Sequence, residues 1–258
     1  MGDPVLSERR GAVALLTLSR PEVLNALDRA TLECLRGALA ELARDAGLRA
    51  VVVTGSGRAF AAGADIAEMR TLDAPQAEAF SRLGREAFAA LEALPVPTVA
   101  AVNGFALGGG CELACACDWI YASNRARFGQ PEVGLGLLPG FGGTSRLLRR
   151  VGAGWAKELV LGGEPIDAET ALRIGLANRL FEPEQLLAAA LAAAEKIAAK
   201  GPLAVAYAKR VIQEGQDADQ RVAHALEQKS FGLVFATEDR AEGMDAFLEK
   251  RQPRFRGR

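Results

Sequence analysis

Short apolar runs alternate with longer amphipathic segments over the first half of the chain. Residues 28–43 and 73–94 repeat apolar positions at helical spacing, and Asp28 can cap the first of these helices. A third helix is predicted at 111–117. Four runs are almost wholly apolar and short enough to be buried strands: residues 11–18, 50–54, 98–102 and 119–122. Buried strands that alternate with helices predict an α/β fold.

After Gly140 the pattern becomes almost purely helical. Only residues 177–181 resemble a strand, and the basic, polar residues 251–258 are expected to form a frayed tail. Seven further helices are predicted, at residues 143–151, 153–161, 167–174, 183–200, 202–213, 216–235 and 237–250. We therefore expect an α/β arrangement in the first two-thirds of the chain and helices in the last third.

Composition and charge exclude several classes of protein. The chain has 258 residues, half of them apolar, and its 31 Lys and Arg nearly balance 32 Asp and Glu. Such a chain is globular, and it lacks the basic excess typical of a nucleic-acid binder. It contains neither a secretory signal nor an apolar run long enough to cross a membrane. We expect a soluble, cytoplasmic protein with no nucleic-acid or membrane partner.

The single histidine restricts the kinds of catalytic and metal site that the chain can form. His224 alone could serve a Ser-His or Cys-His pair, and a His-rich metal site is excluded. The four cysteines form no C-x-x-C pair, which favours small buried side chains in a reducing compartment. A phosphate-binding P-loop is absent, and Pro139 occupies the third glycine position of a dinucleotide-binding motif that would begin at Gly134. Carboxylates, backbone groups or a bound cofactor must therefore supply the chemistry.

Three glycine-rich segments stand out, at residues 60–66, 108–110 and 140–143. Glycine lets a backbone approach a ligand closely, and N–H groups at a helix start have no partner within the helix. Gly109 and Gly110 are thus candidate donors to a developing oxyanion. The alternative to a ligand-binding role is that these glycines only allow a strand to pack tightly against a helix.

Two carboxylates lie beside these segments. Glu112 follows the triple glycine and has apolar neighbours, where an unpaired charge is costly, and Glu132 lies in a turn-rich segment. The alternatives are an acidic residue favoured at a helix start and an ordinary loop carboxylate. Paired carboxylates with backbone N–H donors suit proton transfer beside a carbonyl, with the donors holding an enolate.

Motifs along almost the whole chain resemble the crotonase (enoyl-CoA hydratase/isomerase) family, and most closely its enoyl-CoA hydratases. The segments that carry the resemblance, in the order of the chain, are 19–27, 60–66, 106–114, 128–132, 138–144, 235–244 and 247–251. The resemblance implies an α/β spiral of ββα units over residues 1–190. It also implies a C-terminal helical region, residues 191–258, that builds homotrimers, commonly stacked as hexamers.

In this family the substrate is an acyl-CoA thioester, with no metal or redox cofactor and with a role in fatty-acid β-oxidation. The resemblance implies that the N–H groups of Ala64 and Gly109 form the oxyanion hole. It further implies a substrate-binding set: Val23, Leu24, Ala62, Asp65, Ile66, Gly108, Leu138, Pro139 and Gly140, with Phe231 and Lys250 contributed by a neighbouring subunit. Glu22 departs from the pattern, because many relatives carry a basic residue near the CoA phosphates.

Glu112 and Glu132 occupy both catalytic carboxylate positions of the family. The resemblance implies that they hold a water between them, which adds to Cβ of a 2-trans-enoyl-CoA while Cα receives a proton. We assign Glu132 as the acid for Cα and Glu112 as the group that activates water. Isomerases of the family often keep only the later carboxylate, so the pair favours hydration. An isomerase, a pathway-specific hydratase, and a non-catalytic CoA- or RNA-binding homologue remain alternatives.

Overall fold

The larger of two sheets contains the apolar runs that were predicted as strands. In the computed structural model, which describes residues 2–258, six strands are ordered β1-β2-β3-β5-β7-β10. They are β1 (Val5–Arg10), β2 (Val13–Leu18), β3 (Ala50–Gly55), β5 (Thr98–Val102), β7 (Trp119–Ser123) and β10 (Arg179–Phe181). β1 pairs antiparallel with β2, and the other neighbours pair in parallel. β1 was not predicted, because its largely exposed, polar residues lack an apolar run.

A second, smaller sheet was missed by the sequence pattern. Its order is β4-β6-β8-β9, formed by β4 (Ala59–Ala61), β6 (Phe105–Leu107), β8 (Arg127–Gly129) and β9 (Ile166–Asp167). These strands have only two or three residues each, too few to show an alternating pattern. Each of β4, β6 and β8 directly follows a strand of the larger sheet and precedes a helix. The chain thus advances in ββα units, as the predicted spiral requires.

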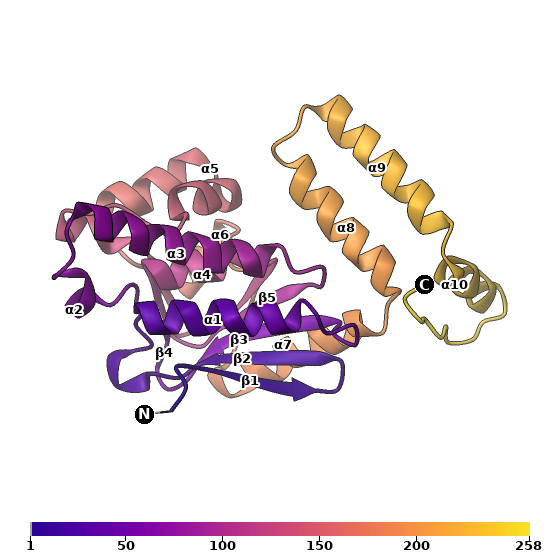
Figure 1. Cartoon of the computed structure of the whole chain (residues 1–258), viewed down its shortest axis with the longest axis horizontal. Helices are drawn as coiled ribbons and strands as arrows, with labels where there is room; N and C mark the ends of the chain where they lie inside the picture. The colour runs from indigo at the N-terminus through magenta and orange to yellow at the C-terminus, as the bar shows by residue number, and fades with distance from the viewer. Residues whose placement is uncertain (1) are drawn as a thin grey trace.

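Helices cover both faces of the larger sheet (Figure 1). On one face α1 (Arg29–Leu42) packs against α3 (Ala74–Glu92), and on the other α7 (Pro183–Ala198) contacts β2, β3, β5, β7 and β10. Side chains alternate along a strand, so Val51 and Val53 join the core under α1 and α3 while Val52 packs with α7. The predicted boundary between residues 190 and 191 falls inside α7, and the division into two domains stays a prediction.

The remaining elements of the spiral are short or interrupted. They are α2 (Ile66–Met69), α4 (Gly109–Ala116), α5 (Gly143–Gly162), α6 (Ala168–Arg173) and the 3-10 turns η1 (Pro21–Val23) and η2 (Pro131–Leu135). The predictions at 143–151 and 153–161 are the two halves of α5, which Gly152 interrupts with a φ of +75°. α4 begins two residues earlier than predicted, at the second residue of the triple glycine.

Three C-terminal helices stand apart from the sheets in Figure 1. They are α8 (Pro202–Gly215), α9 (Gln220–Phe235) and α10 (Glu238–Leu248), and α8 and α9 pack against each other. Lys209 of α8 ties this region to the spiral, because its ammonium lies 2.9 Å from the Asp118 carboxylate and donates to the Val96 carbonyl at 2.9 Å. Large apolar side chains such as Phe231, Phe247 and Leu248 remain exposed on α9 and α10.

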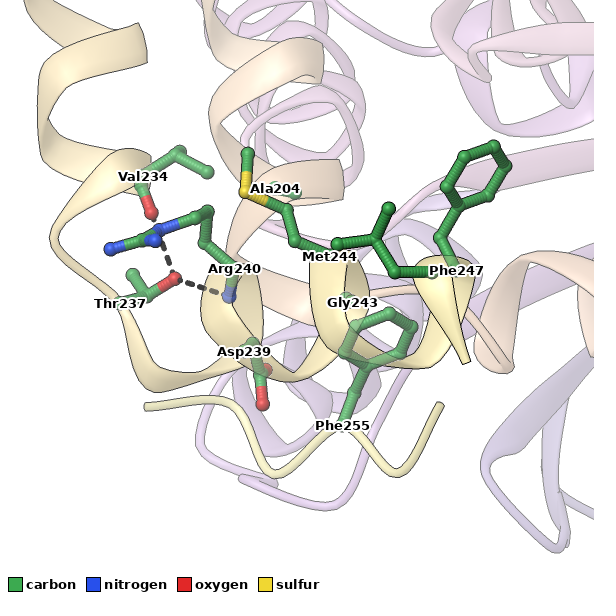
Figure 2. A pocket seen from close by; sticks show the side chains of 11 residues that line it. Ala204, Val234, Thr237, Asp239, Arg240, Gly243, Met244, Phe247 and Phe255 are labelled. Atoms are coloured by element: carbon green, nitrogen blue, oxygen red, sulfur yellow. Dashed lines mark hydrogen bonds between the residues drawn. The ribbon is translucent and has the colours of Figure 1, made fainter. Parts of the chain in front are cut away.

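The prediction of a frayed tail at 251–258 is wrong. The N–H groups of Arg256 and Gly257 donate to the two oxygens of Asp239, at 2.6 and 2.7 Å. Figure 2 shows the Phe255 ring against α10, where it lines a cavity of about 620 Å³ near Gly243. The tail is ordered because a carboxylate that is 6% exposed accepts two of its backbone donors. Pattern analysis could not detect this pairing, since the partners lie 17 and 18 residues apart.

Candidate active site

The start of α4 lies directly against the smaller sheet. Gly108 is the N-cap with a φ of +47°, and Gly109 is the first helical residue, so its N–H has no acceptor within the helix. A Cβ on Gly110 would collide with the Ala61 carbonyl of β4. Glycine is therefore required both for the turn and for the close approach of the helix to β4, and this brings the Gly109 N–H beside the segment that follows β4.

That neighbouring segment contains the second predicted oxyanion donor, Ala64. Gly63 has a φ of +111°, and a Cβ built on it would lie 3.9 Å from the nitrogen of Gly109. Ala64 forms a parallel bridge with Leu27, through the N–H groups of Leu27 and Asp65. The N–H of Ala64 itself takes no part in that bridge. The structure thus places the two predicted donor segments side by side.

The loop after β2 pairs with the same segment. The Ala62 N–H donates to the Leu24 carbonyl at 3.0 Å, which brings together two segments that the sequence predicts to bind the CoA portion. Leu24 and Asn25 adopt φ values of +56° and +58°. The buried Asn25 amide stabilises this turn by donating to the carbonyls of Ser56 and Ala59, at 2.9 and 2.8 Å.

Glu112 points from the first turn of α4 into a buried environment. It is 1% exposed, and its Oε1 accepts the N–H groups of Phe141 at 2.8 Å and Gly143 at 2.6 Å. The pKa of Glu112 is raised to about 7, chiefly by burial and in part by the nearby charge of Glu132. The two N–H donors and the charge of Arg146 act in the opposite direction. A carboxyl that titrates near neutrality is suited to acid–base chemistry.

Glu132 approaches the same helix start from η2. A Cβ on Gly108 would lie 2.8 Å from the Glu132 Oε1, so the carboxylate lies against the glycine turn. Burial raises the pKa of Glu132 as well. Gln130, fully buried, donates to the two oxygens of Glu132 at 3.1 and 3.2 Å when its amide nitrogen faces that carboxylate. The structure therefore brings both predicted carboxylates and both predicted donor segments together around the start of α4.

A sequence model described as enoyl-CoA hydratase/isomerase matches residues 8–258 of the chain. The chain belongs to this family. It is 48% identical to a short-chain-enoyl-CoA hydratase of Clostridium acetobutylicum, over 96% of this chain and 95% of the relative. It is 47% identical to a crotonyl-CoA hydratase of Syntrophomonas wolfei, over 97% of each. The crystal structure of an enoyl-CoA hydratase from Bacillus anthracis superimposes with a TM-score of 0.96 at 38% identity, covering 99% of this chain and 100% of that one.

These matches confirm the crotonase fold and the family predicted from the motifs. The spiral of ββα units and the three C-terminal helices are the family's architecture in this chain. The individual roles given to the site residues stay predictions, and the structure shows only where each residue lies.

The remaining predicted substrate-binding residues lie around this centre. Asp65 caps α2, and its carboxylate also pairs with Arg20 at 3.2 Å, so its side chain already has protein partners. Ile66 is half exposed beside it. Leu138 is 69% exposed in the loop before α5, Pro139 is buried, and the Gly140 carbonyl accepts from Ser81.

The last two predicted residues are not near the others within one chain. Phe231 lies on α9 and Lys250 just after α10, both exposed. Figure 1 shows α9 and α10 well away from α4. A role at the site therefore requires that they come from another copy of the chain.

No cluster of three or more His, Cys, Asp or Glu within residues 2–258 is arranged to hold a metal ion. His224 is exposed on α9, away from the glycine turn. Over the same described residues, no helix has the length and apolar character needed to span a membrane.

Sequence reasoning missed three parts of the site. Gln130, Phe141 and Arg146 were not singled out, although the first two lie within motifs that carried the resemblance. In the sequence, neither the uncharged side chain of Gln130 nor the apolar side chain of Phe141 suggests a role in acid–base chemistry. An unexplained Gln directly before the Pro-Glu of η2, and an aromatic residue between glycines, are the signals that could have identified them.

Proposed function

We propose that the chain is an enoyl-CoA hydratase, which adds water reversibly to a 2-trans-enoyl-CoA and produces a 3-hydroxyacyl-CoA. The observation that carries the proposal is the proximity of Glu112 and Glu132 at the start of α4, beside the segments that contain the N–H groups of Ala64 and Gly109. The hydratase relatives and their near-complete coverage support the same activity.

The backbone donors polarise the thioester. The N–H groups of Ala64 and Gly109 both donate hydrogen bonds to the thioester oxygen, and they bind it more strongly as negative charge develops in the enolate. The positive end of α4 adds to this stabilisation. A single donor of this kind typically contributes roughly 10²–10³ in rate.

The carboxyl pair handles the water and the proton. Glu112 uses Oε1 to accept from Phe141 and Gly143, which leaves Oε2 to accept from the attacking water. Glu132 delivers the proton to Cα. Burial raises the pKa of both carboxyls, and the nearby charge of Glu132 contributes to the rise at Glu112. One carboxyl then acts as the base and the other as the acid of the same addition. The raised pKa of Glu112 would also suit an acid, whereas the proposal makes Glu112 the base that activates water. Single variants of each carboxylate must therefore test which of them is the acid and which is the base.

The nucleotide and acyl portions occupy the surrounding segments. Val23, Leu24, Ala62, Asp65 and Ile66 contact the CoA portion, in part through backbone groups of the paired loop. Gly108, Leu138, Pro139 and Gly140 complete the predicted substrate-binding set. This chemistry requires no metal or redox cofactor, since CoA belongs to the substrate. A cytoplasmic location and a role in β-oxidation remain predictions that rest on the sequence.

A homotrimer, alone or stacked as a hexamer, would complete the site. Phe231, Phe247 and Leu248 are 68%, 82% and 77% exposed, an apolar surface that one copy leaves uncovered. Figure 2 shows Phe247 and Met244 at the cavity beside α10. In such an assembly Phe231 and Lys250 of one copy contact the CoA bound by the next.

The experiment that tests the function compares two positions of the double bond. Purified protein is incubated with crotonyl-CoA and, separately, with a 3-enoyl-CoA, and the conjugated enoyl absorbance is followed. Hydration predicts loss of absorbance from crotonyl-CoA. A gain of absorbance from the 3-enoyl-CoA with no loss from crotonyl-CoA indicates an isomerase instead. No change with either substrate indicates a binding homologue. The isomerase result and the absence of any change would each contradict the proposal.

A further inference from the structure

Arg146 of α5 lies behind Glu112 and is held in place on several sides. Its side chain is 10% exposed, and its Nε and Nη2 donate to the two oxygens of Glu92 at 2.8 and 2.6 Å. The third nitrogen, Nη1, donates to the Phe141 carbonyl at 2.6 Å. The guanidinium also lies 6.0 Å from the Phe88 ring centre. A bidentate pair of this kind fixes both the position and the plane of the arginine.

Phe141 links that arginine to the carboxylate. Its N–H donates to Glu112, its carbonyl accepts from Arg146, and its ring packs edge-on against Phe80 and Phe88 at 5.4 and 5.6 Å. Gly84 of α3 makes room for the ring, because a Cβ there would collide with it. The backbone of residue 141 is therefore held by its donor, its acceptor and its side chain.

The next residues have little freedom to shift. Gly142 adopts a φ of +105°, and a Cβ on it would collide with the Arg146 guanidinium. Gly143, the first residue of α5, supplies the second donor to Glu112. Arg146 of α5 is therefore connected to Glu112 through hydrogen bonds: it donates to the Phe141 carbonyl, and the Phe141 and Gly143 N–H groups donate to Glu112.

We propose that Arg146 is a positioning residue for the hydration reaction: by holding the Phe141 carbonyl, it aims the Phe141 and Gly143 N–H groups at Glu112 Oε1. This orients Oε2 toward the water. The inference rests on the proposed hydratase function, since only an ordered Glu112 that activates water makes the alignment matter for rate.

The charges around Glu112 give this role a distinctive signature. Glu132 on η2 raises the pKa of Glu112, whereas Arg146 on α5 lowers it, and Glu92 on α3 partly neutralises Arg146. Other titratable groups near α4 are Cys111, Cys115 and Cys117 in and after the helix, and Arg150, whose guanidinium donates to the carbonyls of Cys115 and Cys117. Loss of Arg146 removes a positive charge and loosens two donors, so the pKa of Glu112 rises further.

The test uses Arg146→Met, Arg146→Lys and a matched control, Arg149→Met. Arg149 lies on the same helix as Arg146, and its replacement breaks an exposed ion pair with Asp217, which follows α8. For Arg146→Met we expect kcat for crotonyl-CoA to fall roughly 10–100-fold near neutrality, with a smaller change in KM. The pH–rate profile should move to higher pH. Arg146→Lys keeps the charge and should retain the wild-type pH profile with an intermediate kcat, and the control should match wild type.

A second readout does not depend on activity. In protein labelled with ¹³C at the glutamate carboxyls, the Glu112 signal is assigned by its absence from Glu112→Gln and titrated in wild type and Arg146→Met. A higher pKa in Arg146→Met supports the proposal. An unchanged Glu112 titration in the folded variant overturns it, even if wild type hydrates crotonyl-CoA. If wild type does not hydrate, the proposed function fails, and the titration still decides whether Arg146 controls Glu112.

Discussion

At the scale of single residues, Glu112 is the position where function and stability conflict most. A buried carboxyl with a pKa of about 7 costs the fold free energy whenever it must be charged. The structure offsets part of this cost with two backbone donors rather than with a direct ion pair. Both donors bind Oε1, so Oε2 remains free to accept from a substrate water, a feature that a purely structural carboxylate does not require.

Replacing Glu112 with glutamine should therefore stabilise the protein, and more so at high pH. A glutamine oxygen still accepts from Phe141 and Gly143 but carries no charge. The pKa of this carboxyl is raised in the folded state, so wild type loses stability as pH rises from the unfolded value of 4.5 through about 7. We expect Glu112→Gln to exceed wild type by up to about 3 kcal/mol at pH 8 and by little at pH 5. Urea unfolding at both pH values measures this, and equal stabilities at pH 8 would contradict it.

At this scale the sequence predicted only those site residues whose type is unusual for their position. The triple glycine and the carboxylate after it pointed to α4, because Gly108 needs a positive φ and Gly110 a close contact. Arg146 could not be found in the same way, since its partner Glu92 lies 54 residues away. Pairs that meet only through tertiary packing leave no periodic trace in the sequence.

At the scale of elements, one polar cluster ties the C-terminal helices to the spiral. Asp118 accepts from the Thr98 N–H at 2.7 Å and from Lys209 of α8, and Gln213 of the same helix donates to the Glu92 carbonyl at 3.1 Å. Glu92 also holds Arg146. The anchor of α8 and the support of Glu112 therefore meet at the end of α3.

Lys209→Met should weaken this anchor measurably. Asp118 would stay charged and mostly buried, with its side chain 18% exposed and without its cation. We expect a loss of about 2–3 kcal/mol in unfolding free energy, measured in urea. Arg210→Met is the matched control, because Arg210 is its exposed neighbour paired with Glu214, and it should unfold like wild type. If both variants unfold alike, the ion pair does not anchor α8.

Elements were predicted best where they were long and periodic. α1 and α3 begin and end within about two residues of their predicted bounds, with Asp28 as the N-cap of α1. β4, β6, β8 and β9 could not be predicted, because short strands are stabilised by their neighbours in the sheet rather than by their own sequence. The second sheet, which positions Gly109 and Ala64, is thus the part of the fold that depends most on long-range contacts.

At the scale of the whole molecule, the site and the assembly depend on each other in our proposal. The spiral contains the carboxylates and the proposed oxyanion donors, and α9 and α10 carry exposed apolar side chains that we propose to pack against another copy. Charge is nearly balanced over the chain, so net repulsion between copies is small. The family motifs predicted this organisation, which composition alone could not.

Assembly should fail when that surface is made polar. We expect wild type to sediment as a trimer or hexamer and a Phe247→Ser/Leu248→Ser double variant to sediment at lower mass, since both side chains are more than three-quarters exposed in one copy. Leu161→Ser is the matched control on α5, 71% exposed and outside the C-terminal helices. Sedimentation velocity measures this, and a monomeric wild type is the contrary result.

The central claim is that Glu112 and Glu132 together carry out hydration, and kcat for crotonyl-CoA in single glutamine variants tests it most directly. General acid–base groups contribute roughly 10²–10⁴ each, so we expect Glu112→Gln and Glu132→Gln to lose at least about 10²-fold in kcat. His224→Ala, an exposed position on α9, should keep the wild-type rate. Near-wild-type hydration by either glutamine variant would contradict the two-carboxylate mechanism.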